Sequence, residues 1–123
     1  MHWKDLEVWK QAHSLVLVAY RLSNSFPECE RYRLTSQLCR AAVSVPANIV
    51  EGNARGSTKE YIQFLIMARG SLEETRYFAL LGNELGYLNA SDYDQFEDRC
   101  ESVSRMLNGL LRALRSKGPR RLA

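Results

Sequence analysis

The chain has 123 residues, of which 46% are hydrophobic and 25% are charged, and these values are typical of one globular domain. No apolar run approaches the ~20 residues that span a bilayer, and residues 1–5 lack the apolar core of a secretory signal. We therefore expect a single cytoplasmic domain over residues 1–123 with no membrane partner. The net charge of +3 is too small for a surface that is basic all over.

The first helix is predicted over residues 5–23 because apolar residues recur there at alternating spacings of four and three. This stripe consists of Val8, Ala12, Leu15, Ala19 and Leu22. A second stripe beside it consists of Leu6, Trp9, Val16 and Tyr20. The apolar face is therefore wide, and Trp9 and Tyr20 are candidates for contacts with another subunit.

The second helix is predicted over residues 31–53, after Pro27 has blocked continuation of the first. Its apolar seam consists of Leu34, Leu38, Ala41, Val45 and Ile49. Pro46 falls inside this pattern, where it removes a backbone donor and crowds the carbonyl of Ala42, at a cost of about 3 kcal/mol if nothing compensates. The amide of Asn48 can either bond a carbonyl freed by the proline or meet its equivalent across a subunit interface and set its register.

The third helix is predicted over residues 57–85, and Ser57 and Glu60 fit a capping box at its start. Gly86 follows its end, where it is free to adopt the left-handed conformation. The seam consists of Tyr61, Leu65, Ala68, Leu72, Thr75, Ala79 and Gly82. Four residues add apolar surface on other sides, namely Ile62, Phe64, Ile66 and Met67, so this helix is either central or shared with another subunit.

The fourth helix is predicted over residues 91–117, before Gly118 and Pro119 end it. Its seam consists of Tyr93, Phe96, Cys100, Val103, Leu107, Leu110 and Leu114. A sustained seven-residue repeat predicts helices that cross at about 20° in a left-handed sense. The fold class is therefore all-α, an antiparallel up-down-up-down left-handed four-helix bundle that assembles into a homo-oligomer.

The basic residues gather at the end of the chain. From residue 105 onward there are six basic residues and no acids, so residues 1–104 carry 11 basic and 14 acidic residues and a net charge of −3. The candidates for contacts with RNA or DNA phosphates in this segment are Arg112, Arg115, Arg120 and Arg121. The alternative is that these cations complement the dipole of the fourth helix, which begins with acids.

A second candidate phosphate site lies at the start of the third helix, where Arg55 and Lys59 accompany free backbone N–H groups. Against this, Ser57 and Glu60 can satisfy those donors themselves. Arg69 is a further candidate on the third helix, and the acidic pair Glu73-Glu74 is expected to be solvated or to pair with Arg69 and Arg76. Arg40 is expected to pair with Glu51 or with an acid of a neighbouring helix, and the alternative is a solvent-facing contact with RNA.

No catalytic, metal or cofactor site is expected. His2 and His13 have no cysteine or carboxylate neighbours at zinc spacing, and no Glu-x-x-His pair offers a di-metal bundle site. The Gly52-x-x-x-Gly56 spacing lacks the lysine of a phosphate-binding loop. Three cysteines without a C-x-x-C pair are typical of reduced thiols, and these are Cys29, Cys39 and Cys100.

Many short segments stand in an order that resembles the four-helix-bundle proteins encoded within intervening sequences of bacterial 23S ribosomal RNA genes, a family that includes the accessory variability proteins of diversity-generating retroelements. These segments are Asp5–Trp9, Leu34–Leu38, Arg40–Ile49, Glu51–Gly52, Arg55–Ser57, Phe64–Leu65, Ala68–Ser71 and Gly86–Leu88. The resemblance covers roughly residues 3 to 115. Two positions depart from the family pattern. Cys39 stands where a basic residue is frequent, and Val50 stands where a small residue is common.

The resemblance implies a homopentamer without enzymatic activity, with nucleic acid and a reverse transcriptase or a ribosomal component as partners. Two function classes remain open. One is a nucleic-acid-associated scaffold that uses its basic residues against phosphates, and its binding weakens steeply with salt. The other is a structural or protein-interaction oligomer without nucleic-acid binding, held together by the surplus apolar surface of the first and third helices.

Overall fold

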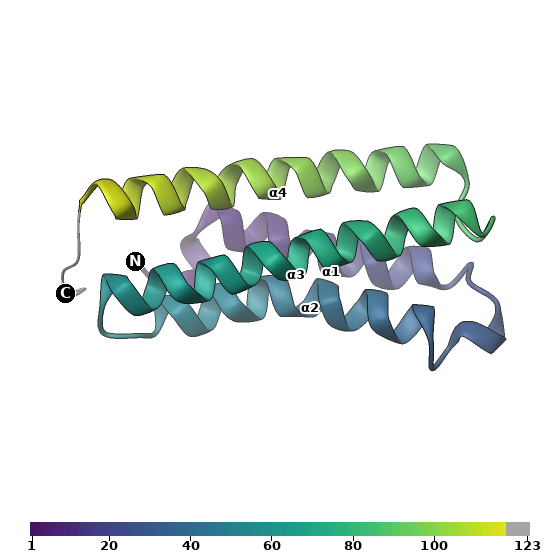
Figure 1. The fold of residues 1–123 in the computed structure, drawn as a ribbon, viewed down its shortest axis with the longest axis horizontal. Coiled ribbons are helices and arrows are strands. Elements are labelled where there is room, and N and C mark those ends of the chain that lie inside the picture. Colours follow the sequence, from purple (N-terminus) through teal and green to yellow (C-terminus); the bar gives the residue numbers. More distant parts are fainter. Residues whose placement is uncertain (118–123) are drawn as a thin grey trace.

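The computed structural model describes residues 1–117, and these residues form four helices and no strand. The helices are α1 (Glu7–Ser23), α2 (Leu34–Asn53), α3 (Thr58–Glu84) and α4 (Ala90–Ser116), and two short 3-10 turns, η1 (Trp3–Asp5) and η2 (Glu28–Glu30), precede α1 and α2 (Figure 1). The architecture agrees with the expected all-helical four-helix bundle. The candidates Arg120 and Arg121 lie outside the described residues.

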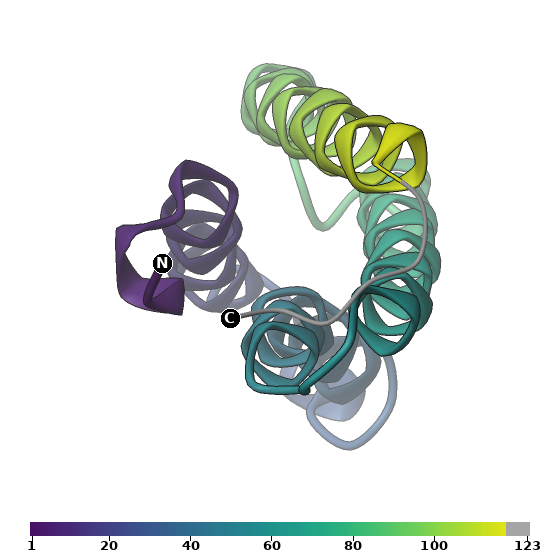
Figure 2. The ribbon, with the colours of Figure 1, turned by 90° about the vertical axis from the view of Figure 1, so that its left-hand side faces the viewer.

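Each helix contacts two others, in the order α1, α2, α3, α4 and back to α1, as the view along the bundle shows (Figure 2). Within residues 1–117, α1 and α3 share no such contact, because they lie diagonally across the core. The α1–α2 and α3–α4 connections lie at one end of the bundle, and η1, the α2–α3 turn and the last turns of α4 lie at the other (Figure 1). We call the latter the η1 end.

The predicted seams of α2 and α3 are buried along their whole length. In α4 the predicted seam is buried from Phe96 to Leu107, and Tyr93 before it is half-buried. Beyond Leu107 the buried side chains are Leu111 and Leu114, while Leu110 is half-buried against the core, so the seam shifts by one residue from the prediction there. The reason is that a straight helix has 3.6 residues per turn and drifts away from a strict seven-residue repeat.

Two helices begin later than predicted. Leu6 is extended (φ −73°, ψ 126°), so α1 begins at Glu7 and η1 is a separate turn. Arg33 has φ −120° and ψ −108°, so α2 begins at Leu34 and not at residue 31. The carboxylate of Glu30 accepts a hydrogen bond from the N–H of Leu34 at 3.4 Å and supplies the cap that α2 otherwise lacks.

Helices α2 and α3 make the most extensive contact of the bundle. The hydroxyls of Ser44 and Ser71 are 2.8 Å apart across this contact. α2 stays helical through the buried Pro46. The amide of Asn48 donates to the carbonyl of Ser44 at 2.8 Å and to its hydroxyl at 3.0 Å. It does not bond the carbonyl of Ala42, which is the one that Pro46 leaves without its helical donor.

Candidate nucleic-acid interface and exposed apolar surfaces

The start of α3 is capped by its own side chains. The Ser57 hydroxyl accepts a hydrogen bond from the backbone N–H of Glu60 at 3.3 Å and donates one to the carboxylate of Glu60 at 3.1 Å. Only half of the predicted capping box forms, because the carboxylate meets the hydroxyl and not the backbone N–H of Ser57. A carboxylate at this position repels an anion, so the phosphate site predicted at the helix terminus is disfavoured.

The two cations beside this terminus differ in their surroundings. The guanidinium of Arg55 donates to the carboxylate of Glu51 at 2.6 Å and lies 4.8 Å from the centroid of the Phe64 ring. Glu51 therefore pairs with Arg55 and not with Arg40, which contradicts the first of the two pairings expected for Arg40. Lys59 is exposed and makes no ion pair within residues 1–117, so its ammonium is open to solvent.

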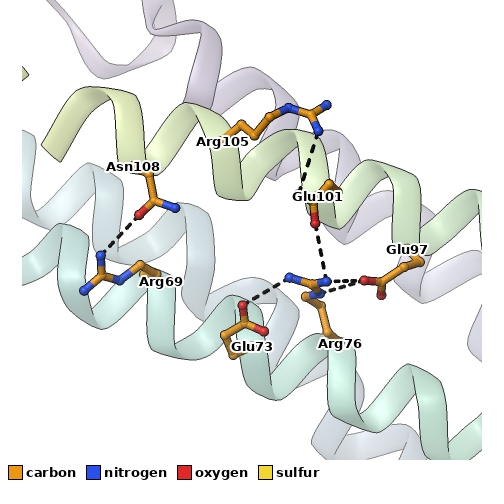
Figure 3. A network of polar contacts seen from close by, with 7 residues as sticks. All are labelled: Arg69, Glu73, Arg76, Glu97, Glu101, Arg105 and Asn108. Carbon is orange, nitrogen blue, oxygen red and sulfur yellow. Dashed lines mark hydrogen bonds and ion pairs between the residues drawn. The ribbon is translucent and has the colours of Figure 1, made fainter. Parts of the chain in front are cut away.

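Arg69 lies between α3 and α4, where it is half-buried and donates to the side-chain carbonyl of Asn108 at 3.2 Å (Figure 3). Arg112 and Arg115 are exposed on the last turns of α4 and line an open groove with Asn108, Leu111 and Ser116. Neither of the two makes an ion pair within the described residues. Arg112 and Arg115 are therefore available to a phosphate, whereas Arg69 serves the packing of α3 on α4.

The η1 end is accordingly basic. We use the name "basic end" for four exposed cations at this end of the bundle, which are Lys59, Arg112, Arg115 and Lys117. The acids of α4 lie in its first half, toward the opposite end, and these are Asp92, Asp94, Glu97, Asp98 and Glu101. α4 therefore carries its negative charge near its N-terminus and its positive charge near its C-terminus, which also suits its dipole.

An ion-pair network centred on Arg76 joins α3 to α4 (Figure 3). The guanidinium of Arg76 donates to Glu97 at 2.8 Å through Nε, to Glu73 at 3.1 Å, and to Glu101 at 3.4 Å. The hydrogen bond to Glu97 is the main reason why the pKa of Arg76 is raised above its ordinary value. The predicted ion pair between Glu73 and Arg76 is confirmed, whereas Glu73 does not pair with Arg69. The sequence did not predict the other partners of Arg76, Glu97 and Glu101, because they lie on a different helix.

Large apolar side chains are exposed on two sides of the bundle. Tyr20 is 53% exposed and Ile66 is 39% exposed, while Trp9 and Ile62 are half-buried against the core. Met67 on α3, which was also predicted to add apolar surface outside the seam, is exposed as well. Further exposed residues that the sequence pattern did not single out are Leu17 on α1, Val43 on α2, and Tyr77 and Leu80 on α3. In the sequence these residues can be recognised as large apolar residues that lie outside the predicted seams. The exposed residues of α1 and those of α3 lie on two helices that are diagonal to each other and share no contact, while Val43 lies on α2, which contacts both.

No group of three His, Cys, Asp or Glu side chains within residues 1–117 is placed to hold a metal ion. Cys100 is fully buried, and this burial raises the pKa of its thiol to about 12, so the thiol is neutral and shielded. No helix in the same range is long and apolar enough to cross a membrane.

Comparison with known proteins places the chain in a family. No curated protein matches it. The solved structure of a protein of unknown function from the S23 ribosomal protein family of Bacteroides thetaiotaomicron superposes with a TM-score of 0.76 at 20% identity, covering 85% of this chain and 97% of that chain, which shows the same fold. The profile of the 23S rRNA-intervening sequence proteins matches residues 4–109. The chain therefore belongs to the family of 23S rRNA-intervening sequence proteins.

Proposed function

We propose that this protein is a non-enzymatic scaffold, an up-down-up-down bundle that assembles into a homo-oligomeric ring and binds RNA through its basic end. The observation that supports the RNA-binding part is that three exposed cations without ion pairs in the described range lie together at one end of the molecule, and these are Lys59, Arg112 and Arg115. The printed name of the family refers to ribosomal RNA, which makes RNA the first nucleic acid to test.

Assembly supports this function because one subunit offers only a few cations. In a ring the basic end is repeated once per subunit, and simultaneous contacts raise the overall affinity without any new kind of contact. Five subunits, the number that the family resemblance implies, would present Lys59, Arg112 and Arg115 five times. A weak phosphate site then becomes a useful one.

The two apolar surfaces support a ring over a two-fold dimer. A two-fold interface uses the same surface on both subunits, whereas a ring of more than two subunits uses two different surfaces that fit each other. Leu17 and Tyr20 are exposed on α1 and Met67 and Tyr77 are exposed on α3, and these two helices share no contact. Side chains of this size are rarely left in water when they gather in patches.

Fluorescence anisotropy with labelled RNA at several salt concentrations tests the RNA-binding part. We expect binding at low salt, with an affinity that falls as a power of the salt concentration because condensed counterions are released. Replacing Lys59, Arg112 and Arg115 by Gln lowers both the affinity and the salt slope, by up to about three counterions. The matched control replaces three exposed arginines at the opposite end by Gln, namely Arg21, Arg31 and Arg33, and leaves binding unchanged.

A second candidate function is a purely structural or protein-interaction oligomer, and the exposed apolar surfaces favour it. Its partner would be a larger protein, such as a reverse transcriptase or a ribosomal component. The same experiment separates the two candidates, because an assembled protein that binds no RNA or DNA at low salt supports the second. An effect of equal size from the control variant would also contradict a role for the basic end.

A further inference from the structure

Four aromatic rings form a continuous series at the start of the chain, and we call it the aromatic series. The ring centroids of His2 and Trp3 are 5.0 Å apart. Trp3 meets Trp9 edge-on at 4.9 Å, and Trp9 stacks on His13 at 5.0 Å with 5° between the ring planes. The series runs from η1 onto the first two turns of α1. It lies outside the phosphate contacts proposed above.

The series is held in place although little of it belongs to the core. Trp9 packs against the core from one side, but η1 contributes no buried residue. The turn is ordered by a hydrogen bond from the N–H of Lys4 to Nδ1 of His2 at 3.2 Å. Trp3 is half-buried, and the rings of His2 and His13 are exposed. The rings are therefore fixed in position while part of their surface faces solvent.

Cations accompany these rings. The ammonium of Lys4 lies 5.6 Å from the centroid of the Trp3 ring, and Lys10 is exposed next to Trp9 in the sequence. Asp5 and Glu7 offset this charge locally, so the series alone does not attract a polyanion strongly. However, η1 lies at the same end of the bundle as the start of α3 and the last turns of α4, which carry the basic end (Figures 1 and 2).

We propose that the aromatic series is a stacking platform for unpaired bases of single-stranded RNA, whose phosphates the basic end holds. This inference rests on the proposed function and specifies its ligand. Aromatic rings beside cations recognise single strands because every base has a π-face that can stack on them. In a duplex those faces are covered by neighbouring base pairs, so the platform favours single strands over duplexes of equal charge.

Tryptophan fluorescence reports directly on the aromatic series, because both tryptophans of the chain belong to it. We expect saturable quenching of tryptophan fluorescence by a short oligouridylate, since a base that stacks on the rings quenches them. An abasic sugar-phosphate oligomer with the same number of phosphates keeps the charge and lacks the bases. It should bind about tenfold more weakly and without quenching, as should a duplex RNA of matched charge.

Variants assign the effect to the rings. Trp3→Leu and His13→Ala should each weaken oligouridylate binding by roughly tenfold and leave binding of the abasic oligomer unchanged. Trp3→Tyr keeps an aromatic face and should retain most of the affinity. The matched control is Tyr32→Leu, which removes a ring that is 85% exposed at the opposite end and should change nothing. Circular dichroism checks that each variant is folded, and η1 has no buried side chain whose loss would unfold it.

The possible failures are distinguishable. If RNA binds but the abasic oligomer binds equally well, or if folded Trp3→Leu and His13→Ala both bind like the wild type, the platform is wrong and the phosphate contacts stand. If the oligouridylate, the abasic oligomer and the duplex RNA all fail to bind at low salt, the proposed RNA binding is wrong, and the stacking platform is wrong as well.

Discussion

At the scale of single residues, Gly52 determines how closely α2 approaches α3. A Cβ atom at this position would lie 2.8 Å from Cβ of Phe64 and 3.0 Å from Cδ1 of Tyr61. Cβ of Phe64 is fixed to its helix, so the two helices would have to separate. We expect Gly52→Ala to lower the free energy of unfolding by about 1–3 kcal/mol, in spite of the better helix propensity of alanine.

Gly109 on α4 is the matched control, because a Cβ atom there has no neighbour within 4 Å and α4 carries neither of the proposed interface surfaces. Gly109→Ala should raise the free energy of unfolding by about 1 kcal/mol, since only the helix propensity changes. Urea denaturation of both variants gives the comparison. Equal effects of the same sign would show that the close approach at Gly52 does not constrain the helices.

Cys100 makes stability depend on alkaline pH. Its burial raises the pKa of the thiol from 9.0 to about 12. In the unfolded chain the thiol ionises near pH 9, so between about pH 9 and 12 the folded state binds more protons than the unfolded state. The contribution of Cys100 is therefore fully present below pH 9 and is lost as the pH rises, at up to about 1.4 kcal/mol per pH unit.

The variant Cys100→Ala should lose stability less steeply than the wild type between pH 9 and 10, whatever its stability at neutral pH. Denaturation at several pH values measures this slope, and other titrating groups cancel in the comparison. Thiol labelling gives an independent check, because the exposed Cys29 should react in the folded protein while Cys100 reacts only after unfolding. Identical slopes would contradict the raised pKa.

At the scale of helices, Arg76 joins α3 to α4. Its side chain is 25% exposed and that of Glu97 is 29% exposed, so this pair is shielded more than an ordinary surface pair. Arg76→Gln leaves three carboxylates without their common partner, and we expect it to cost about 1–2 kcal/mol, between the values for exposed and buried pairs. Chemical denaturation at low and high salt should show a smaller cost at high salt.

The neighbouring Arg105 provides the control for Arg76. It lies 3.8 Å from Glu101, and its side chain is 70% exposed. Arg105→Gln should therefore change the free energy of unfolding by no more than about 0.5 kcal/mol. A cost for Arg105→Gln that matched the cost for Arg76→Gln would mean that the network stabilises only through general charge balance.

The helices and their seams were largely predictable because burial of an apolar stripe leaves a periodic signal in the sequence. The left-handed Gly86, with φ +83°, was predictable for a similar local reason. The start of α2 was not, because its cap is a side chain four residues upstream. The hydrogen bond of Arg69 to Asn108 was not predictable either, because the two residues are 39 positions apart in the sequence. Arg112 and Arg115, the candidate phosphate contacts on α4, are exposed, and their contact with phosphate stays a prediction.

At the scale of the whole molecule, the separation of the apolar surfaces leads to a prediction about assembly. If the interface joins the α1 surface of one subunit to the α3 surface of the next, Leu17→Glu and Met67→Glu each remove one half of it. Leu17 is 58% exposed and Met67 is 53% exposed, so a charge at either position should not unfold the subunit. We expect the wild type to form a ring and each variant to be a monomer by light scattering.

Mixing the two variants distinguishes a ring from a two-fold dimer. Each variant keeps the surface that the other has lost, so one intact interface forms between them and an equimolar mixture should yield heterodimers that cannot grow further. Ala113→Glu, an exposed position on α4, is the control and should leave the ring intact. If each variant alone were a dimer, the two surfaces would each pair with themselves. If the wild type were a monomer, the exposed side chains would not hold subunits together, and the basic end would have to bind RNA without the avidity of a ring.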